Sequence, residues 1–439
     1  MTHPLPPLVA ERLRALRECP AEPTDKGFGL LAAGMDGPAP AGPARTRPAV
    51  HAPGFSYPVL TLRESALAGN LAEMAAYCAR AGVELAPHGK TAMSPELAAR
   101  QLASGAWGIT VATIGQLRAY RAFGFPRLLL ANELVDETGI AWLAGELAAD
   151  PGFAAYCYVD SPDGVAILDR VLSARPAGRR LPVLVEIGLG RTGCRTDDGA
   201  LEVAKAAAAT STLAVAGVAG YEGTISGTDA RALDAVAAFC RRLANLAGAL
   251  LASTGADGGP DGAGFIVTAG GSVYFDVVTR ELTAGGSGVP AGMTVVLRSG
   301  GYLFHDHGLY QRATPAARGV AGAPALRPAL ELWAQVLSRP EPGLALLSAG
   351  RRDAGFDAGL PVPLRARRRD GGVAGLAGAA VTGLNDQHAY LRLDPGTALA
   401  PGDLVCLGIS HPCTTLDKWR LIPVLDDEDR VIDAVHTFF

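Results

Sequence analysis

Three features that would assign a chain to a particular class are missing from this sequence. It has no long run of lysine and arginine and a formal net charge of -4 over 439 residues, so it lacks the electrostatic footprint of a nucleic-acid-binding protein. The N-terminus has no basic segment followed by an apolar core, which predicts no secretory leader. Charged residues interrupt the apolar segments before they reach membrane-spanning length. We therefore expect neither a nucleic-acid partner nor a membrane partner.

A disulfide framework is also missing. The seven cysteines are odd in number and scattered along the chain, which favours a reducing compartment, so we expect a cytoplasmic protein. With 49% hydrophobic and 19% charged residues, a chain of this length is expected to form one large globular domain and a smaller one.

Short apolar runs alternate with segments of helical periodicity through the middle of the chain. Gly82 is placed to end one helix, and Ser94-Pro95 to begin the next. Eight such runs are typical of an eight-stranded parallel α/β barrel, with a doubly wound open sheet as the alternative. The expected strands are residues 83–86, 109–112, 128–130, 156–159, 183–187, 213–218, 265–267 and 295–297.

The flanking segments differ from this pattern. Residues 1–50 are expected to form an N-terminal arm, with a short helix near 11–17, an irregular connector at 38–49 and some contact with the C-terminal domain. Residues 51–315 are assigned to the barrel. Helical periodicity ends near residue 320, so residues 316–439 are predicted to form an all-β domain. Its expected strands are 330–337, 344–347, 389–393, 404–407, 419–425 and 431–435.

In a parallel α/β barrel the catalytic and binding residues lie directly after the strands, so candidate site residues are expected there. Polar residues and glycines follow most of the expected strands here, although ordinary loops also contain them. These positions are Lys90, Thr113, Asn132, Arg191, Tyr221, Gly270-Gly271-Ser272 and Ser299-Gly300-Gly301-Tyr302.

Lys90 is the first candidate for catalysis. It follows a strand end and the turn residues Pro87 and Gly89, so it occupies a rigid position. A lysine that forms an imine must lose its proton, and burial or a nearby cation lowers its pKa. The alternative is a solvated loop lysine.

Two glycine-rich loops are candidates for binding an anionic group. Gly270-Gly271-Ser272 would let backbone N–H groups approach a phosphate, although a plain tight turn has the same composition. In the loop 188–193, Arg191 supplies a cation, and the alternative is a solvated surface arginine.

His411 and Cys413 form a candidate metal site. In extended chain their side chains point to one side, about 6–7 Å apart at the Cα atoms, and an imidazole and a thiolate bind Zn²⁺ well. The alternative is a half-buried cysteine beside a loop histidine. His305 and His307, separated by Asp306, are a rival metal pair. His388 could be a ligand, a general acid or base, or a structural histidine.

The ordered set of motifs resembles one family. Pro87-His88-Gly89-Lys90-Thr91, the 190–193 and 220–223 loops, Gly270-Gly271-Ser272 and His411-Pro412-Cys413 together resemble the D-serine dehydratase and D-threonine aldolase group. This group belongs to the alanine-racemase-like, fold type III enzymes that use pyridoxal 5'-phosphate. The resemblance covers residues 50–439 and implies a barrel followed by a β-domain.

The resemblance also implies roles for individual residues. Lys90 would carry the pyridoxal phosphate, and His88 would also belong to the cofactor-binding residues. Arg191 and Tyr221 would lie by the cofactor ring, and His411 and Cys413 would bind a divalent metal, expected to be zinc. The phosphate would lie near Gly270, Gly271, Ser272 and Tyr302.

Finally, the resemblance implies a reaction. Cys413 is similar to the dehydratases of the group, whereas its aldolases tend to have a carboxylate there. We therefore expect dehydration of a β-hydroxy-D-amino acid such as D-serine to a keto acid and ammonia, by a homodimer. A D-threonine-type aldolase, a racemase and a non-catalytic pyridoxal phosphate carrier are the alternatives.

Overall fold

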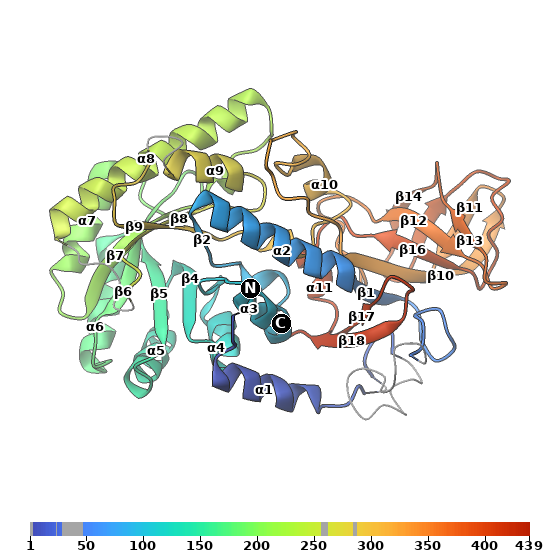
Figure 1. Ribbon diagram of the computed structural model, residues 1–439, viewed down its shortest axis with the longest axis horizontal. Helices are drawn as coiled ribbons and strands as arrows, with labels where there is room; N and C mark the ends of the chain where they lie inside the picture. The colour runs from blue at the N-terminus through green and yellow to red at the C-terminus, as the bar shows by residue number, and fades with distance from the viewer. Residues whose placement is uncertain (1–2, 23, 29–46, 256–261, 284–287) are drawn as a thin grey trace.

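A barrel wrapped by helices and a domain made of β-strands lie next to each other in the molecule (Figure 1). The computed structural model describes residues 3–22, 24–28, 47–255, 262–283 and 288–439. Most of the expected connector at 38–49 therefore lies outside the described residues.

Eight parallel strands form the barrel, in the order β2-β9-β8-β7-β6-β5-β4-β3. A parallel bridge between His88 and Thr110 joins the two ends of this sheet, and the Trp107 N–H donates to the Leu85 carbonyl at 2.7 Å. The expected barrel is confirmed, with all eight strands where the sequence predicts them. The strands are β2 (Glu84–Leu85), β3 (Ile109–Val111), β4 (Arg127–Glu133), β5 (Ala154–Val159), β6 (Leu181–Ile187), β7 (Leu213–Gly220), β8 (Phe265–Ala269) and β9 (Met293–Leu297).

The helices around the barrel begin and end at residues with clear local causes. Gly82 ends α2 in the left-handed conformation, with φ of 64°. The Ser94 hydroxyl accepts the Leu97 N–H at the start of α3, and Pro95 occupies a position where no N–H is needed. The helices are α2 (Glu64–Ala81), α3 (Pro95–Ala103), α4 (Ile114–Ala122), α5 (Glu137–Ala149), α6 (Pro162–Ala174), α7 (Asp197–Ala208), α8 (Ala230–Thr254), α9 (Phe275–Leu282) and α10 (Leu309–Ala313).

Among the described residues, α8 alone is long and apolar enough to cross a membrane by length and composition. This differs from the expectation that charged residues interrupt every apolar segment. Half of its most apolar window is buried, and α8 packs against β7, β8, α7 and α9. Core helices of soluble proteins have the same length and composition.

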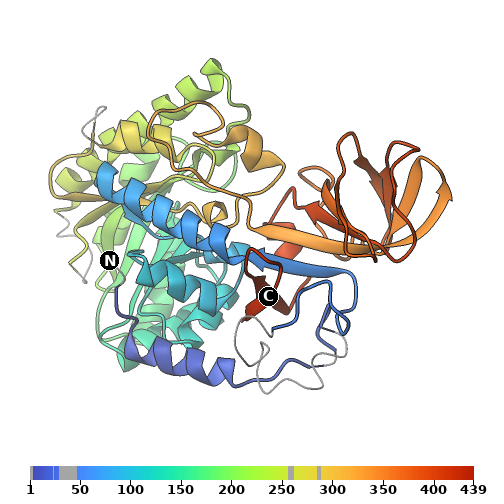
Figure 2. The same ribbon diagram turned by 45° about the vertical axis from the view of Figure 1, so that its right-hand side comes forward.

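The second domain contains a ten-stranded sheet. Its long strand β10 begins beside the barrel and extends to the end of the β-domain that lies away from the barrel (Figures 1 and 2). The expected strands are present, and three more lie between residues 362 and 384. Periodicity did not reveal these three because β12 alternates little and β13 and β14 contain glycine. The strands are β10 (Leu330–Glu341), β11 (Leu344–Leu347), β12 (Val362–Arg367), β13 (Val373–Gly375), β14 (Ala380–Leu384), β15 (Ala389–Arg392), β16 (Leu404–Gly408), β17 (Leu421–Leu425) and β18 (Val431–His436).

One strand of this sheet comes from the N-terminal part of the chain. β1 (Val59–Arg63) pairs antiparallel with β10 and parallel with β17. The expected start of the barrel at residue 51 therefore falls before a strand that belongs to the β-domain sheet. Arg63 donates to Glu331 at 2.7 Å and to Asp429 at 2.6 Å, which fixes this pairing with charged hydrogen bonds.

The N-terminal arm touches both domains. α1 (Pro7–Arg17) packs beside α3, and the His3 N–H donates to the Ala103 carbonyl at 2.7 Å. Further along, Ala49 forms a bridge with Arg430 of the β-domain.

Asn70 fixes the junction between α2 and the segments that lead into the β-domain. It is fully buried, and its Nδ2 donates to the carbonyls of Leu303 at 2.9 Å and Arg327 at 2.8 Å. Its Oδ1 accepts the Arg327 N–H at 2.8 Å. One side chain therefore satisfies three backbone groups, of which the Leu303 carbonyl is buried and the two of Arg327 are partly buried.

We expect Asn70→Ala to lower the free energy of unfolding by roughly 2–4 kcal/mol, because it leaves the buried Leu303 carbonyl and the partly buried Arg327 backbone groups without partners. Denaturant unfolding monitored by circular dichroism measures the change. The matched control is Asn245→Ala on the exposed face of α8, which should change stability by less than about 0.5 kcal/mol. Similar effects of the two substitutions would contradict this role of Asn70.

Candidate active site

A cavity of about 450 Å³ opens at the carboxyl ends of the barrel strands, where the fold predicts chemistry. Residues from both domains line it. Eight of the ten predicted site residues are brought together there: His88, Lys90, Arg191, Tyr221, Gly271, Ser272, His411 and Cys413. Gly270 and Tyr302 do not line it.

Lys90 lies on a short 3₁₀ turn, Gly89–Thr91, directly after β2. The Tyr120 hydroxyl donates to the Gly89 carbonyl at 2.9 Å, and a Cβ at Gly89 would come within 2.6 Å of that hydroxyl. The turn is therefore fixed, while the Lys90 side chain extends into open cavity space. Desolvation by the surrounding protein lowers the pKa of Lys90, the charges of Arg191 and Arg298 lower it further, and Cys413 opposes them.

His88 closes the barrel with its backbone and lines the cavity with its side chain. Burial lowers the pKa of His88 well below its usual value, with the Lys90 and Arg298 charges acting in the same direction, so its ring is neutral. Gly300 must be glycine at this point, because a Cβ there would lie 2.5 Å from the His88 carbonyl oxygen.

Two arginines supply positive charge to the cavity. Arg191 extends from the loop after β6, with its guanidinium carbon 5.0 Å from the centre of the Tyr221 ring. Arg298 follows β9, and it was not predicted. Its guanidinium is buried and donates to the Thr268 hydroxyl at 2.7 Å and the Gly220 carbonyl at 2.6 Å. Arg298 could have been found from its position directly after the apolar run 295–297. The glycines that follow it were chosen as candidates instead.

The expected phosphate cradle is arranged differently from the prediction. The N–H groups of Gly270 and Gly271 donate to the buried carboxylate of Glu222, at 3.1 and 2.5 Å. They are thus already satisfied. Ser272 does reach the cavity, and its hydroxyl accepts the Gly301 N–H at 3.1 Å. Tyr310, which was not predicted, also lines this end of the cavity.

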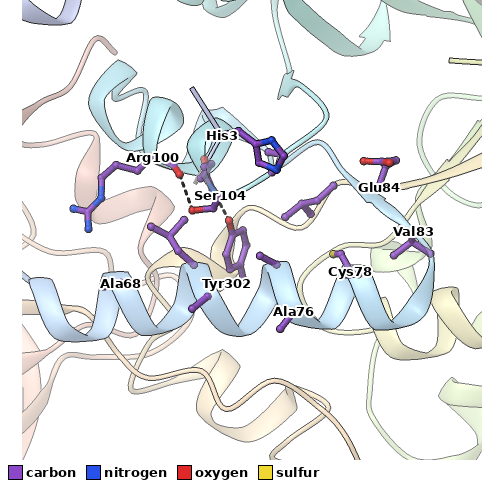
Figure 3. Close-up of a pocket in the computed structure, with 17 residues that line it drawn as sticks. His3, Ala68, Ala76, Cys78, Val83, Glu84, Arg100, Ser104 and Tyr302 are labelled. Atoms are coloured by element: carbon purple, nitrogen blue, oxygen red, sulfur yellow. Dashed lines mark hydrogen bonds between the residues drawn. The ribbon is translucent and has the colours of Figure 1, made fainter. Parts of the chain in front are cut away.

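Tyr302, which was predicted to lie by a phosphate, does not line the candidate site. Its ring faces a second cavity of about 730 Å³ between α2 and α3, whose α2 wall includes Ala68 and Ala76 (Figure 3). The Gln101 Nε2 donates to its hydroxyl at 3.1 Å. Tyr302 lies in the 3₁₀ turn Gly301–Leu303, where adjacent residues point in different directions. Gly301 therefore lines the candidate site and Tyr302 does not.

His411 and Cys413 reach the cavity from the β-domain, at the start of the short helix α11 (Cys413–Leu416). His411 Nδ1 lies 2.7 Å from a carboxylate oxygen of Asp357, whose other oxygen accepts the Thr414 hydroxyl at 2.7 Å. This leaves Nε2 facing the cysteine. Metal-binding histidines commonly have such a carboxylate on the other ring nitrogen. Asp357 was not predicted, since it lies 54 residues from His411 in sequence.

The thiol and the imidazole shift each other's ionisation. The hydrogen bond with Cys413 raises the pKa of His411 to about 9, against the effect of burial. Burial would raise the pKa of Cys413, but its hydrogen bonds with His411 and Thr91 outweigh burial and lower it. The pair thus favours a thiolate, which is the form that binds metals.

The rival histidines lie outside the cavity lining. His305 Nδ1 is 2.9 Å from the Asp306 carbonyl oxygen, and a carboxylate oxygen of Asp306 accepts the Gly308 and Tyr310 N–H groups. These contacts shape the loop before α10. His388 is exposed in the turn between β14 and β15.

Comparisons with known proteins show the class of enzyme to which the chain belongs. The alanine racemase N-terminal domain model matches residues 62–257, and a putative serine dehydratase domain model matches residues 329–425. Together with a lysine at the end of the first barrel strand, this defines an alanine-racemase-like, fold type III enzyme.

Individual relatives narrow the class. D-threonine aldolase from Arthrobacter sp. is 30% identical over 382 residues, which cover 84% of this chain and 89% of that protein. 3-Hydroxy-D-aspartate aldolase from Paracoccus denitrificans is 28% identical over 308 residues, or 69% of this chain and 74% of that protein. The crystal structure of D-threonine aldolase from Filomicrobium marinum has a TM-score of 0.71 and 26% identity, and covers 88% of this chain and 95% of that chain. The chain belongs to the D-threonine aldolase and D-serine dehydratase-like family of pyridoxal phosphate-dependent enzymes.

The burial of His307 near the site predicts that the stability of the folded protein depends on pH. Burial lowers the pKa of His307 from 6.5 to about 4, so the unfolded chain binds a proton in this range that the folded chain does not. The stabilisation is therefore complete above pH 6.5 and is lost as the pH falls toward 4. From pH 7.5 to pH 5 the loss from this residue should be roughly 2 kcal/mol.

Denaturant unfolding at the two pH values measures this loss. His307→Gln should lose less stability than the unaltered protein on acidification, whereas the exposed control His388→Gln should behave like the unaltered protein. Equal losses in all three proteins would show that His307 does not titrate in this way.

Proposed function

We propose that this chain is a pyridoxal phosphate- and divalent metal-dependent lyase that acts on β-hydroxy-D-amino acids. The observation that carries the proposal is the shared cavity: Lys90 enters it from the barrel, and His411 and Cys413 enter it from the β-domain. The two aldolases matched above are named for D-threonine and 3-hydroxy-D-aspartate, which both have a hydroxyl on the β-carbon.

The cavity residues fit pyridoxal phosphate. A volume of about 450 Å³ lies within the usual range for cofactor sites. Lys90 has a free side chain with a lowered pKa, as covalent attachment requires. We assign the phosphate end to Gly271, Ser272, Gly301 and Tyr310, because glycines permit close approach and the two hydroxyls are donors. Gly270 does not line the cavity and is left out of this assignment. The Gly271 N–H donates to Glu222, so Gly271 would permit close approach without supplying a backbone donor.

The second donor set fits a divalent metal. A thiolate and an imidazole prefer Zn²⁺, and Asp357 fixes the ring so that His411 Nε2 is available. Two protein ligands leave coordination positions for water or substrate, as in catalytic rather than structural sites. The metal would supply a Lewis acid beside the substrate hydroxyl.

Lys90 has two tasks in this scheme. Its Nζ would hold the cofactor, and as a neutral amine with substrate bound it would accept the α-proton. The bound cofactor would supply an electron sink for the charge left on the α-carbon. The low pKa of Lys90 favours the neutral amine needed for both tasks. Arg191 and Arg298 maintain that low pKa through their charges.

Dehydration is the reaction that we propose, with a keto acid and ammonia as the products from a substrate such as D-serine. Two observations support it: Cys413 is similar to the dehydratases of the family, and the serine dehydratase domain model covers the segment that contains it. Aldol cleavage is the second candidate, because the Arthrobacter relative at 30% identity is a D-threonine aldolase. A racemase or a cofactor carrier would have no use for the His411 and Cys413 pair. The homodimer and the cytoplasmic location stay expectations.

Lys90→Ala should abolish turnover, with a loss of roughly 10³-fold or more, because no other lysine among the described residues lines the cavity. Borohydride reduction followed by peptide mass spectrometry should find the cofactor on Lys90 in the unaltered protein and on no lysine in the variant. Lys205→Ala, at an exposed position of α7, is the control and should keep both properties. Retained activity in Lys90→Ala would remove Lys90 from the scheme.

Product analysis separates the two reactions. The protein supplied with pyridoxal phosphate and Zn²⁺ is incubated with D-threonine, with and without a chelator. We expect 2-oxobutanoate and ammonia, lost on chelation and in Cys413→Ala. Glycine and acetaldehyde would establish the aldolase instead. Activity that survives both chelation and Cys413→Ala would contradict the metal proposal.

A further inference from the structure

Three carboxylates that have no part in the scheme above meet at the ends of β4, β5 and β6. Glu133 is the last residue of β4, Asp160 follows β5, and Glu186 lies in β6. One oxygen from each lies within 4.8 Å of the others. Glu186 also lines the candidate active site, so the cluster adjoins that cavity.

Three of the six carboxylate oxygens in this cluster are buried without a hydrogen-bond partner among the described residues. Glu186 is 3% exposed, and its Oε2 is buried with no hydrogen bond among the described residues. Both carboxylate oxygens of Glu133 are likewise buried and have no hydrogen-bond partner among the described residues. Asp160 is better satisfied, since its Oδ2 accepts the Gly193 N–H at 2.9 Å. Buried carboxylates without compensation are strongly unfavourable, so the cluster requires a positive species.

The neighbouring arginines do not fill this need. Arg298 is committed to Thr268 and Gly220, and Arg191 stacks on Tyr221. Within the described part of the chain, neither forms an ion pair with the cluster. The protein's own side chains therefore leave the cluster uncompensated.

We infer that Glu133, Asp160 and Glu186 bind a hard cation such as Mg²⁺, Ca²⁺ or Mn²⁺, at a site separate from the His411 and Cys413 pair. A shared proton would link only two oxygens, whereas three converge here. Oxygen donors alone select hard cations, and the thiolate and imidazole pair selects softer ones. This inference goes beyond the proposed function and does not depend on it, because the site needs neither pyridoxal phosphate nor substrate.

Binding of Mn²⁺ alone tests the inference. The protein carries Cys413→Ala to remove the softer site, is stripped with chelator and is then titrated with Mn²⁺ while electron paramagnetic resonance follows the free ion. We expect about one equivalent bound per chain, displaced by Mg²⁺ or Ca²⁺. Adding Glu186→Gln should weaken binding at least about 10-fold, because it removes one of three anionic ligands.

A matched control and a second variant guard against indirect effects. Glu137→Gln, at the start of α5, alters an exposed glutamate four residues from Glu133 and should leave Mn²⁺ binding unchanged. Asp160→Asn should weaken binding as Glu186→Gln does, and circular dichroism establishes that each variant is folded. Absence of saturable binding at millimolar Mn²⁺, or equal binding with and without Glu186→Gln, would overturn the inference. Either result would leave the test of lyase activity untouched.

Discussion

The active site depends on how a two-residue strand closes the barrel. β2 pairs with β9 along Glu84–Leu85. Past the end of β2, the bridge from His88 to Thr110, nearby backbone hydrogen bonds and the Thr110 hydroxyl, which donates to the Ala86 carbonyl at 2.6 Å, join this segment to β3. The same bridge residue lines the cavity, and Lys90 follows two positions later. The backbone bridge that closes the sheet therefore also fixes the position of the candidate lysine. The close approach of Gly300 to the His88 carbonyl leaves no room for a side chain at this point.

The second half of the site comes from the other domain, so the two domains must hold a fixed relation. β1 contributes to this by crossing from the start of α2 into the β-domain sheet, where it lies between β10 and β17. Asn70 adds three hydrogen bonds at the same junction, one buried and two partly buried. α11 then contacts the Lys90 turn directly, and Cys413 Sγ lies 3.4 Å from the Thr91 hydroxyl. A thiolate from one domain thus meets a lysine turn from the other.

The sequence predicted those features that local patterns encode. Apolar runs and caps such as Gly82 and Ser94 revealed the barrel, and position after a strand identified Lys90, Arg191 and Ser272. Features that depend on contacts between distant segments could not be read in this way. Asp357 is paired with His411 across 54 residues, and Glu222 takes the N–H groups of a turn 48 and 49 residues further on. The direction of a side chain within a turn could not be predicted either. Gly301 lines the site and Tyr302 does not, because adjacent residues of a 3₁₀ turn point in different directions.

The charges in the cavity form an arrangement in which each group affects the next. Arg191 and Arg298 lower the pKa of Lys90, and the Cys413 thiolate raises it. His411 stabilises that thiolate and is itself held by Asp357. The ionisation of a residue in the β-domain therefore influences the basicity of a lysine in the barrel. Neutralising the thiolate would leave the arginines unopposed and favour the uncharged amine. The two halves of the site are thus coupled through charge as well as through packing.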